Sequence, residues 1–127
     1  MVNSMASVVI VKSTQSLANN KQKGKQMKLL TKEITEKATK QYDEGSDMEQ
    51  MVVAKFFNPI GSWSWYLMNL GEDKDYAWGI VDGNAVEMGS WLMSELQNQK
   101  LPFGLGIERD TSFKSIKASE LWKELNA

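Results

Sequence analysis

The residues best suited to chemistry lie in the stretch "LPFGLGIERD" (residues 101–110), where an acid, a base and a second acid follow a nearly uncharged segment. Glu108 and Asp110, with Asp82 from the earlier stretch "GIVDG", offer carboxylate oxygens, the ligands that Mg²⁺ and Mn²⁺ prefer. An ion held by these carboxylates would activate water, and Arg109 would stabilise the negative charge that develops. One hypothesis is therefore a divalent-metal-dependent nuclease.

The same segment also has a structural interpretation, which we favour over a catalytic role. In an extended chain Arg109 points away from both of its neighbours, so it does not simply pair with them. A partly buried arginine requires a planar acceptor, for which Asp82, Glu87 or a backbone carbonyl are candidates. If Gly104 and Gly106 let the segment pass close to a sheet, Arg109 is expected to clamp its end to another element.

Large aromatic side chains form the second candidate site. Residues 62–70 alternate so that one face presents Trp63, Trp65 and Leu67, and the other presents Tyr66, Met68 and Leu70. Both faces are apolar, so either helices cover both or one face is left partly open as a binding platform. Large aromatics at alternate strand positions usually belong to a core, and we favour that role here.

An open aromatic face would give two further hypotheses. Aromatic rings stack nucleobases at about 1–3 kcal/mol each, which suits a single-stranded nucleic-acid binding module. That module requires cations beside the rings, and only Lys55 falls near them in sequence. The other hypothesis is a protein-binding patch, in which Trp63, Trp65, Trp78 and Arg109 are the expected binding residues wherever they are exposed.

Composition excludes several kinds of chemistry. The 127-residue chain has neither Cys nor His, which removes disulfides, thiol nucleophiles, Cys/His zinc sites and imidazole catalysis. No cofactor is expected, apart from Mg²⁺ or Mn²⁺ under the nuclease hypothesis. A chain without Cys also fits a reducing cytosol.

Charge and hydropathy narrow the possible partners. Residues 1–26 carry four lysines and no acid, which leaves −5 on residues 27–127 out of the net charge of −1. We therefore expect a basic, flexible extension before one domain over residues 27–127. An acidic domain argues against duplex DNA as the main ligand and suits a basic partner protein that handles nucleic acid. The longest aliphatic run is Val8 to Val11, so no membrane span or secretory signal is expected, and the predicted location is cytoplasmic.

Periodicity predicts the elements that must position these residues. A helix capped by Thr31 is expected to about Tyr42, followed by strands over 51–57, 62–70, 76–82 and 85–92. The connections between the strands are short, which indicates an antiparallel meander. Ser94 and Ser119 are the expected caps of two later helices. The predicted fold is α+β: a four- to five-stranded antiparallel meander sheet with a helix before it and helices after it.

Several blocks resemble a known family. "MKLLTKEI", "KFFNPIGSWSWY", "GIVDG", "EMGSWLMSEL" and "PFGLGIERD" are similar, in order and spacing, to small bacterial proteins catalogued as a domain of unknown function. The resemblance covers about residues 27–122. It implies that the nuclease hypothesis would be a single-stranded DNA endonuclease, since some similar proteins are described so. It also implies a protein of a mobile genetic element, carried on a plasmid, integrative element or phage, that accompanies DNA transfer or blunts host defence. Our leading hypothesis is thus a non-enzymatic protein that binds a host or element-encoded protein.

Overall fold

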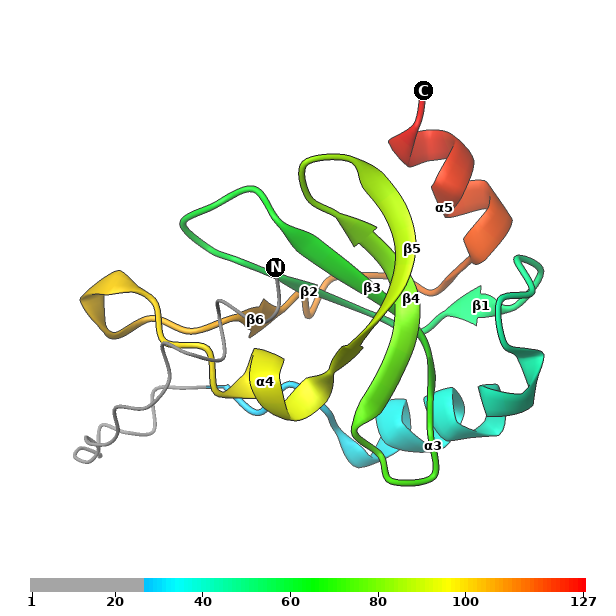
Figure 1. Ribbon diagram of the computed structural model, residues 1–127, viewed down its shortest axis with the longest axis horizontal. Helices are drawn as coiled ribbons and strands as arrows, with labels where there is room; N and C mark the ends of the chain where they lie inside the picture. Colours follow the sequence, from blue (N-terminus) through cyan, green and yellow to red (C-terminus); the bar gives the residue numbers. More distant parts are fainter. Residues whose placement is uncertain (1–26) are drawn as a thin grey trace.

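The computed structural model describes residues 27–127 (Figure 1), so the extension expected over residues 1–26 lies outside the described part. Its helices are α3 (Lys32–Lys40), α4 (Met93–Gln97) and α5 (Ala118–Leu125), with 3-10 turns η3 (Tyr42–Glu44) and η4 (Pro102–Gly104). Its strands are β1 (Met51–Val52), β2 (Ala54–Phe57), β3 (Ser64–Leu70), β4 (Tyr76–Asp82), β5 (Val86–Leu92), β6 (Glu108–Arg109) and β7 (Ile116–Lys117). The predicted α+β class is confirmed, with a helix before the antiparallel sheet and a helix after it.

The main sheet has five strands in the order β5-β4-β3-β2-β6, and every neighbouring pair is antiparallel. Strands β2 to β5 form the predicted meander, and β6 returns to lie beside β2, with Arg109 opposite Phe56. The strand expected over 51–57 is in fact two strands. The chain changes partners at Val53, because β1 pairs with β7 whereas β2 pairs with β3 and β6.

A β-bulge in β3 corrects the predicted alternation of its side chains. The register between β3 and β4 shifts between Leu67 and Asn69, so Met68 is an extra residue. Leu70 therefore packs with Trp65 and Leu67 rather than on the opposite face. Strands β3 and β4 lie close together at the bulge, because a Cβ at Gly79 would collide with the backbone carbonyl oxygen of Tyr66.

Helices cover both faces of the sheet, which settles the choice left open by the apolar pattern. The first face packs against the segment before α3, α3 itself and α4; its buried residues include Leu29, Ala38, Phe56, Trp65 and Leu96. The second face packs against α5; its buried residues are Val52, Tyr66, Met68, Ile80, Ala118 and Leu121. Figure 1 shows α3 and α5 on opposite sides of the strands.

Of the three expected helix caps, only Thr31 is confirmed: its hydroxyl oxygen accepts the Ile34 N–H at 3.0 Å. Ser94 caps nothing, because α4 begins at Met93 and the Ser94 N–H instead donates to the Asp75 carboxylate at 2.7 Å. Ser119 likewise lies inside α5. The first N–H groups of α5 donate to the carbonyls of Gln50 and Met48, so neighbouring backbone takes the place of a capping side chain.

Candidate functional site

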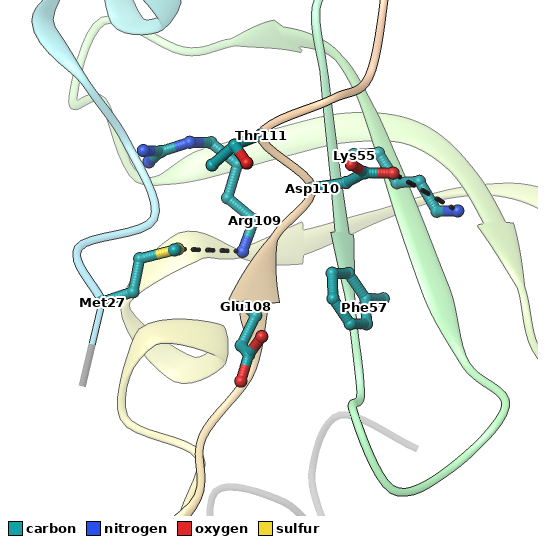
Figure 2. A pocket seen from close by; sticks show the side chains of 7 residues that line it. All are labelled: Met27, Lys55, Phe57, Glu108, Arg109, Asp110 and Thr111. Carbon is teal, nitrogen blue, oxygen red and sulfur yellow. Dashed lines mark hydrogen bonds and ion pairs between the residues drawn. The ribbon is translucent and has the colours of Figure 1, made fainter. Parts of the chain in front are cut away.

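A hollow of about 450 Å³ opens at the β6 edge of the sheet (Figure 2). It is lined by Met27, Lys55, Phe57, Glu108, Arg109, Asp110 and Thr111. The start of the described chain, β2 and β6 thus meet at one place, although they are far apart in sequence. Three residues singled out from the sequence, the acid–base–acid run, border this hollow.

Arg109 clamps the segment before α3. Its guanidinium Nη1 donates to the carbonyl oxygens of Lys28 at 2.7 Å and Leu29 at 2.8 Å. Its backbone N–H donates to the sulfur of Met27 at 3.2 Å, the dashed contact in Figure 2. Gln97 of α4 holds the same segment, accepting from the Leu29 N–H at 2.7 Å and donating to the Met27 carbonyl at 2.8 Å. Arg109 therefore clamps β6 to the segment before α3, and its acceptors are backbone carbonyls.

Asp110 is occupied by local contacts. Its carboxylate lies 3.9 Å from the Lys55 ammonium and accepts the Ser112 N–H at 2.9 Å, which closes the turn after β6. The Lys55 ammonium in turn lies 5.6 Å from the centre of the Tyr66 ring. Lys55 and Asp110 thus form an ion pair on the second face of the sheet, beside the hollow.

The carboxylates of the nuclease hypothesis do not converge. Glu108 lies opposite Phe57, Phe57 opposite Ser64, and Ser64 opposite Asp82, so one row crosses four strands. Three strand spacings of about 4.8 Å place Asp82 roughly 14 Å from Glu108. Within residues 27–127 no three acidic side chains gather closely enough to hold a metal ion.

Tyr66 lies near enough to both Asp82 and Asp110 for their charges to act on its phenol. Burial raises the pKa of its phenol, and the negative charges of Asp82 and Asp110 raise it further, while a hydrogen bond with Ser64 lowers it. Tyr66 is therefore a neutral hydrogen-bonding group at neutral pH rather than a general base.

The three candidate tryptophans do not share one surface. Trp65 is fully buried in the core of the first face. Trp63 is half-buried on the same face, 6.1 Å from Trp65 between ring centres, and its ring covers Gly83, where a Cβ would come within 2.5 Å of it. Trp78 is half-buried on the opposite face. A single aromatic platform made of these residues is therefore absent.

Phe103 has the most exposed large apolar side chain of residues 27–127 and is not among the residues predicted from the sequence. Phe103 is 91% exposed and has a left-handed backbone, with φ of +65°. The Leu101 N–H donates to the Leu105 carbonyl at 2.9 Å, and the Leu105 N–H donates to the Pro102 carbonyl at 3.3 Å, so the loop closes on itself. Figure 1 shows this loop, η4, projecting from the body of the domain.

Gly104 does not bring the segment close to the sheet, contrary to the expectation from the sequence. It has φ of +73°, and nothing lies within 4 Å of where its Cβ would be, so it serves the turn rather than a close approach to the sheet. The signal that would have identified Phe103 is the order Pro-Phe-Gly. Pro and Gly are turn formers, and an aromatic residue between them stands at the tip of the turn.

Within residues 27–127, no helix has the length and apolar character required to cross a membrane. Searches among curated proteins and among solved structures returned no match to this chain. A family model described as a protein of unknown function, DUF2958, matches residues 23–126, which include every strand and helix that the structure describes in residues 27–127. The chain therefore belongs to the DUF2958 family.

Proposed function

We propose that this domain is a non-enzymatic binding protein that docks on another protein through the loop Leu101–Leu105, with Phe103 as the anchor. The observation that carries the proposal is the presentation of Phe103, an almost fully exposed aromatic residue on a self-closed loop. The biological context in the proposal, a mobile genetic element acting on a host or element-encoded protein in anti-defence, rests on the family resemblance alone.

Phe103 carries two energetic penalties in the same place. A left-handed backbone costs a residue with a Cβ roughly 1–2 kcal/mol. A phenylalanine left in water also forgoes about 1.5–3 kcal/mol that burial would provide. Strained, exposed residues of this kind are typical of binding sites, where the rigid presentation lowers the entropy lost on binding. Aromatic anchors also dominate protein interfaces energetically.

Charge favours a basic partner. Residues 27–127 carry a net charge of −5. Lys100 directly precedes the loop and Glu108 follows it, so the charge that favours a basic partner is that of the domain as a whole. Complementary charge would steer a basic protein to the domain more than it would add affinity.

The two other hypotheses have less support. The nuclease requires Asp82, Glu108 and Asp110 on one ion, whereas Asp82 and Glu108 are separated by two strands. The nucleic-acid module requires aromatic rings and free lysines on one face, whereas the tryptophans are divided between faces and Lys55 is paired with Asp110.

The test is affinity capture from a nuclease-treated bacterial host lysate with the full chain. Phe103→Ala is compared with Ile60→Ala, a matched control in another turn where Ile60 is 48% exposed. Truncating an interface hot spot costs about 2 kcal/mol or more, so Phe103→Ala should weaken capture of the specific protein roughly 30-fold. Ile60→Ala should capture it as well as the wild type.

Arg109→Ala is the wrong variant for this purpose, because Arg109 holds Lys28 and Leu29 in place. Circular dichroism of Phe103→Ala would verify that the fold is intact. Equal capture by Phe103→Ala and the wild type, or capture that disappears on nuclease treatment, would contradict the proposal.

A further inference from the structure

The outer edge of β5 is an unprotected strand. Its seven residues, VEMGSWL, contain no Lys and no Pro and only one charge, that of Glu87. Natural sheets protect exposed edges with such residues or by covering the edge, because unpaired N–H and C=O groups bind other strands. In the part of the chain that the structure describes, β5 pairs only with β4.

The register identifies the free backbone groups. The Met93 N–H donates to the Asp75 carbonyl, and the Gly83 N–H donates to that of Ala85, at the two ends of the β4–β5 pair. Antiparallel strands alternate hydrogen-bonded and non-hydrogen-bonded pairs, so Gly89 bonds to β4 whereas Met88 and Ser90 point their backbone groups outward. Within residues 27–127, neither makes a backbone hydrogen bond on that side.

We propose that a second copy of this chain occupies this edge, by antiparallel pairing of β5 with β5 about a two-fold axis at Gly89. In that register Met88 of each copy faces Ser90 of the other, and both exchange their free backbone groups. The pairing joins the two five-stranded sheets into one continuous sheet. It is independent of the proposed function, because β5 and β6 lie at opposite edges.

The side chains of β5 are self-complementary in this register. Val86 faces Leu92 of the second copy, and Leu92 is an apolar side chain that is 36% exposed in the single chain. Glu87 faces Trp91, so the only acid of the strand does not meet its own copy. Like charges directly opposite would destabilise an antiparallel pair, and none arises here.

Gly89 fits the centre of this pairing. A Cβ built on it meets nothing within 4 Å, so the face of the sheet above Gly89 is open and could hold a side chain there. Glycine inside a strand weakens it and often marks a site where another backbone approaches closely. In the proposed register, Gly89 faces itself in a non-hydrogen-bonded pair, in which the Cα atoms lie about 4.5 Å apart.

The proposed pairing gives a closed assembly of two chains. A two-fold contact uses the same edge of both copies and leaves no second copy of that edge free. The opposite edge is covered by the segment that Arg109 and Gln97 hold, so the expected assembly is a dimer rather than an open filament.

The first test is sedimentation of the full chain over a range of concentrations. The wild type should shift from the mass of one chain to twice that mass. Ser90→Pro should lose the dimer, because it removes an outward N–H and no bond to β4. Ser90→Ala, the matched control, keeps that N–H and should remain a dimer.

A second test keeps the proposal falsifiable if Ser90→Pro fails to fold. Because the chain has no cysteine, Gly89→Cys introduces a single thiol at the two-fold axis. Oxidation should link this variant into covalent dimers, since its Cα separation suits a disulfide. Glu87→Cys is the control: four residues of offset place the two thiols roughly 13 Å apart, too far to bridge.

A wild type that sediments as a monomer at every concentration would overturn the proposal. Equal cross-linking of Gly89→Cys and Glu87→Cys would overturn it as well. A monomer whose β5 instead binds an extended segment of a different protein would assign the edge to that partner and also refute the dimer.

Discussion

The two edges of the main sheet differ in how their backbone groups are satisfied. At β6 the outward N–H of Arg109 meets the sulfur of Met27, and the guanidinium holds the carbonyls of Lys28 and Leu29. At β5 a strand of seven residues leaves the outward groups of Met88 and Ser90 without a partner in the described chain. The short edge strand β6 is thus covered by the segment before α3, which Arg109 binds. The longer edge strand β5 is left free to pair with another chain.

The largest expected effect comes from uncovering the β6 edge. Leu29 is fully buried, so Leu29→Ala should lower the free energy of unfolding by about 2–5 kcal/mol. On the β5 edge Leu92 is 36% exposed, and Leu92→Ala should cost about 1 kcal/mol or less in the monomer. Urea unfolding at low protein concentration compares them. Similar losses for both variants would show that the two edges do not differ in burial as described.

Removing the clamp should have the next largest effect. Arg109→Ala deletes two charge-assisted hydrogen bonds to backbone carbonyls and should cost roughly 2–3 kcal/mol of unfolding free energy. Arg109→Lys keeps the charge but loses the planar fork, so an intermediate loss is expected. Lys114→Ala, an exposed cation nearby, is the control. Unchanged stability of Arg109→Ala would return Arg109 to the role of a binding residue.

A smaller effect should appear at high pH through Tyr66. Its pKa in the folded state is raised above the ordinary value of 10.0, chiefly by burial, so the folded protein holds the phenol proton more tightly than the unfolded chain does. Its contribution to stability is complete below pH 10 and is lost as the pH rises through the folded pKa. Tyr66→Phe should therefore show a shallower decline in stability above pH 10. An identical decline in both proteins would refute this coupling.

The smallest effect should come from the ion pair beside the hollow. The Lys55 ammonium and Asp110 carboxylate are 3.9 Å apart and partly exposed, so Lys55→Gln should cost about 1 kcal/mol or less. That difference should shrink at high salt, because ions screen exposed charges. A loss as large as that of Arg109→Ala would mean that this pair, rather than the clamp, secures β6.

Much of the fold could be predicted because it depends on local pattern. The Thr31 cap, the short turns and the β2–β5 meander follow from residue types within a few positions of one another. The failed predictions have a common cause. Ser94 and Ser119 are not caps because Asp75 and the carbonyls of Gln50 and Met48, all distant in sequence, bind the helix starts.

The candidate site could likewise be predicted only where its contacts are local in sequence. The sequence indicated that Arg109 would act as a clamp and named a backbone carbonyl among its possible acceptors. It did not identify the Lys28–Leu29 segment, because a side chain some eighty positions away leaves no local pattern. The Pro-Phe-Gly order that marks Phe103 is a local signal, because the turn formers flank the aromatic residue directly.

By itself, the sequence determined the class of fold, the absence of Cys and His chemistry and the residues around which a site could form. Only the tertiary structure decided that Trp65 is core, that Asp82 and Glu108 lie on separate strands, and that one sheet edge is covered while the other is bare. The physical reason is that burial and edge pairing depend on which distant segments meet. Hydrophobic periodicity specifies the face of a strand but not its neighbour.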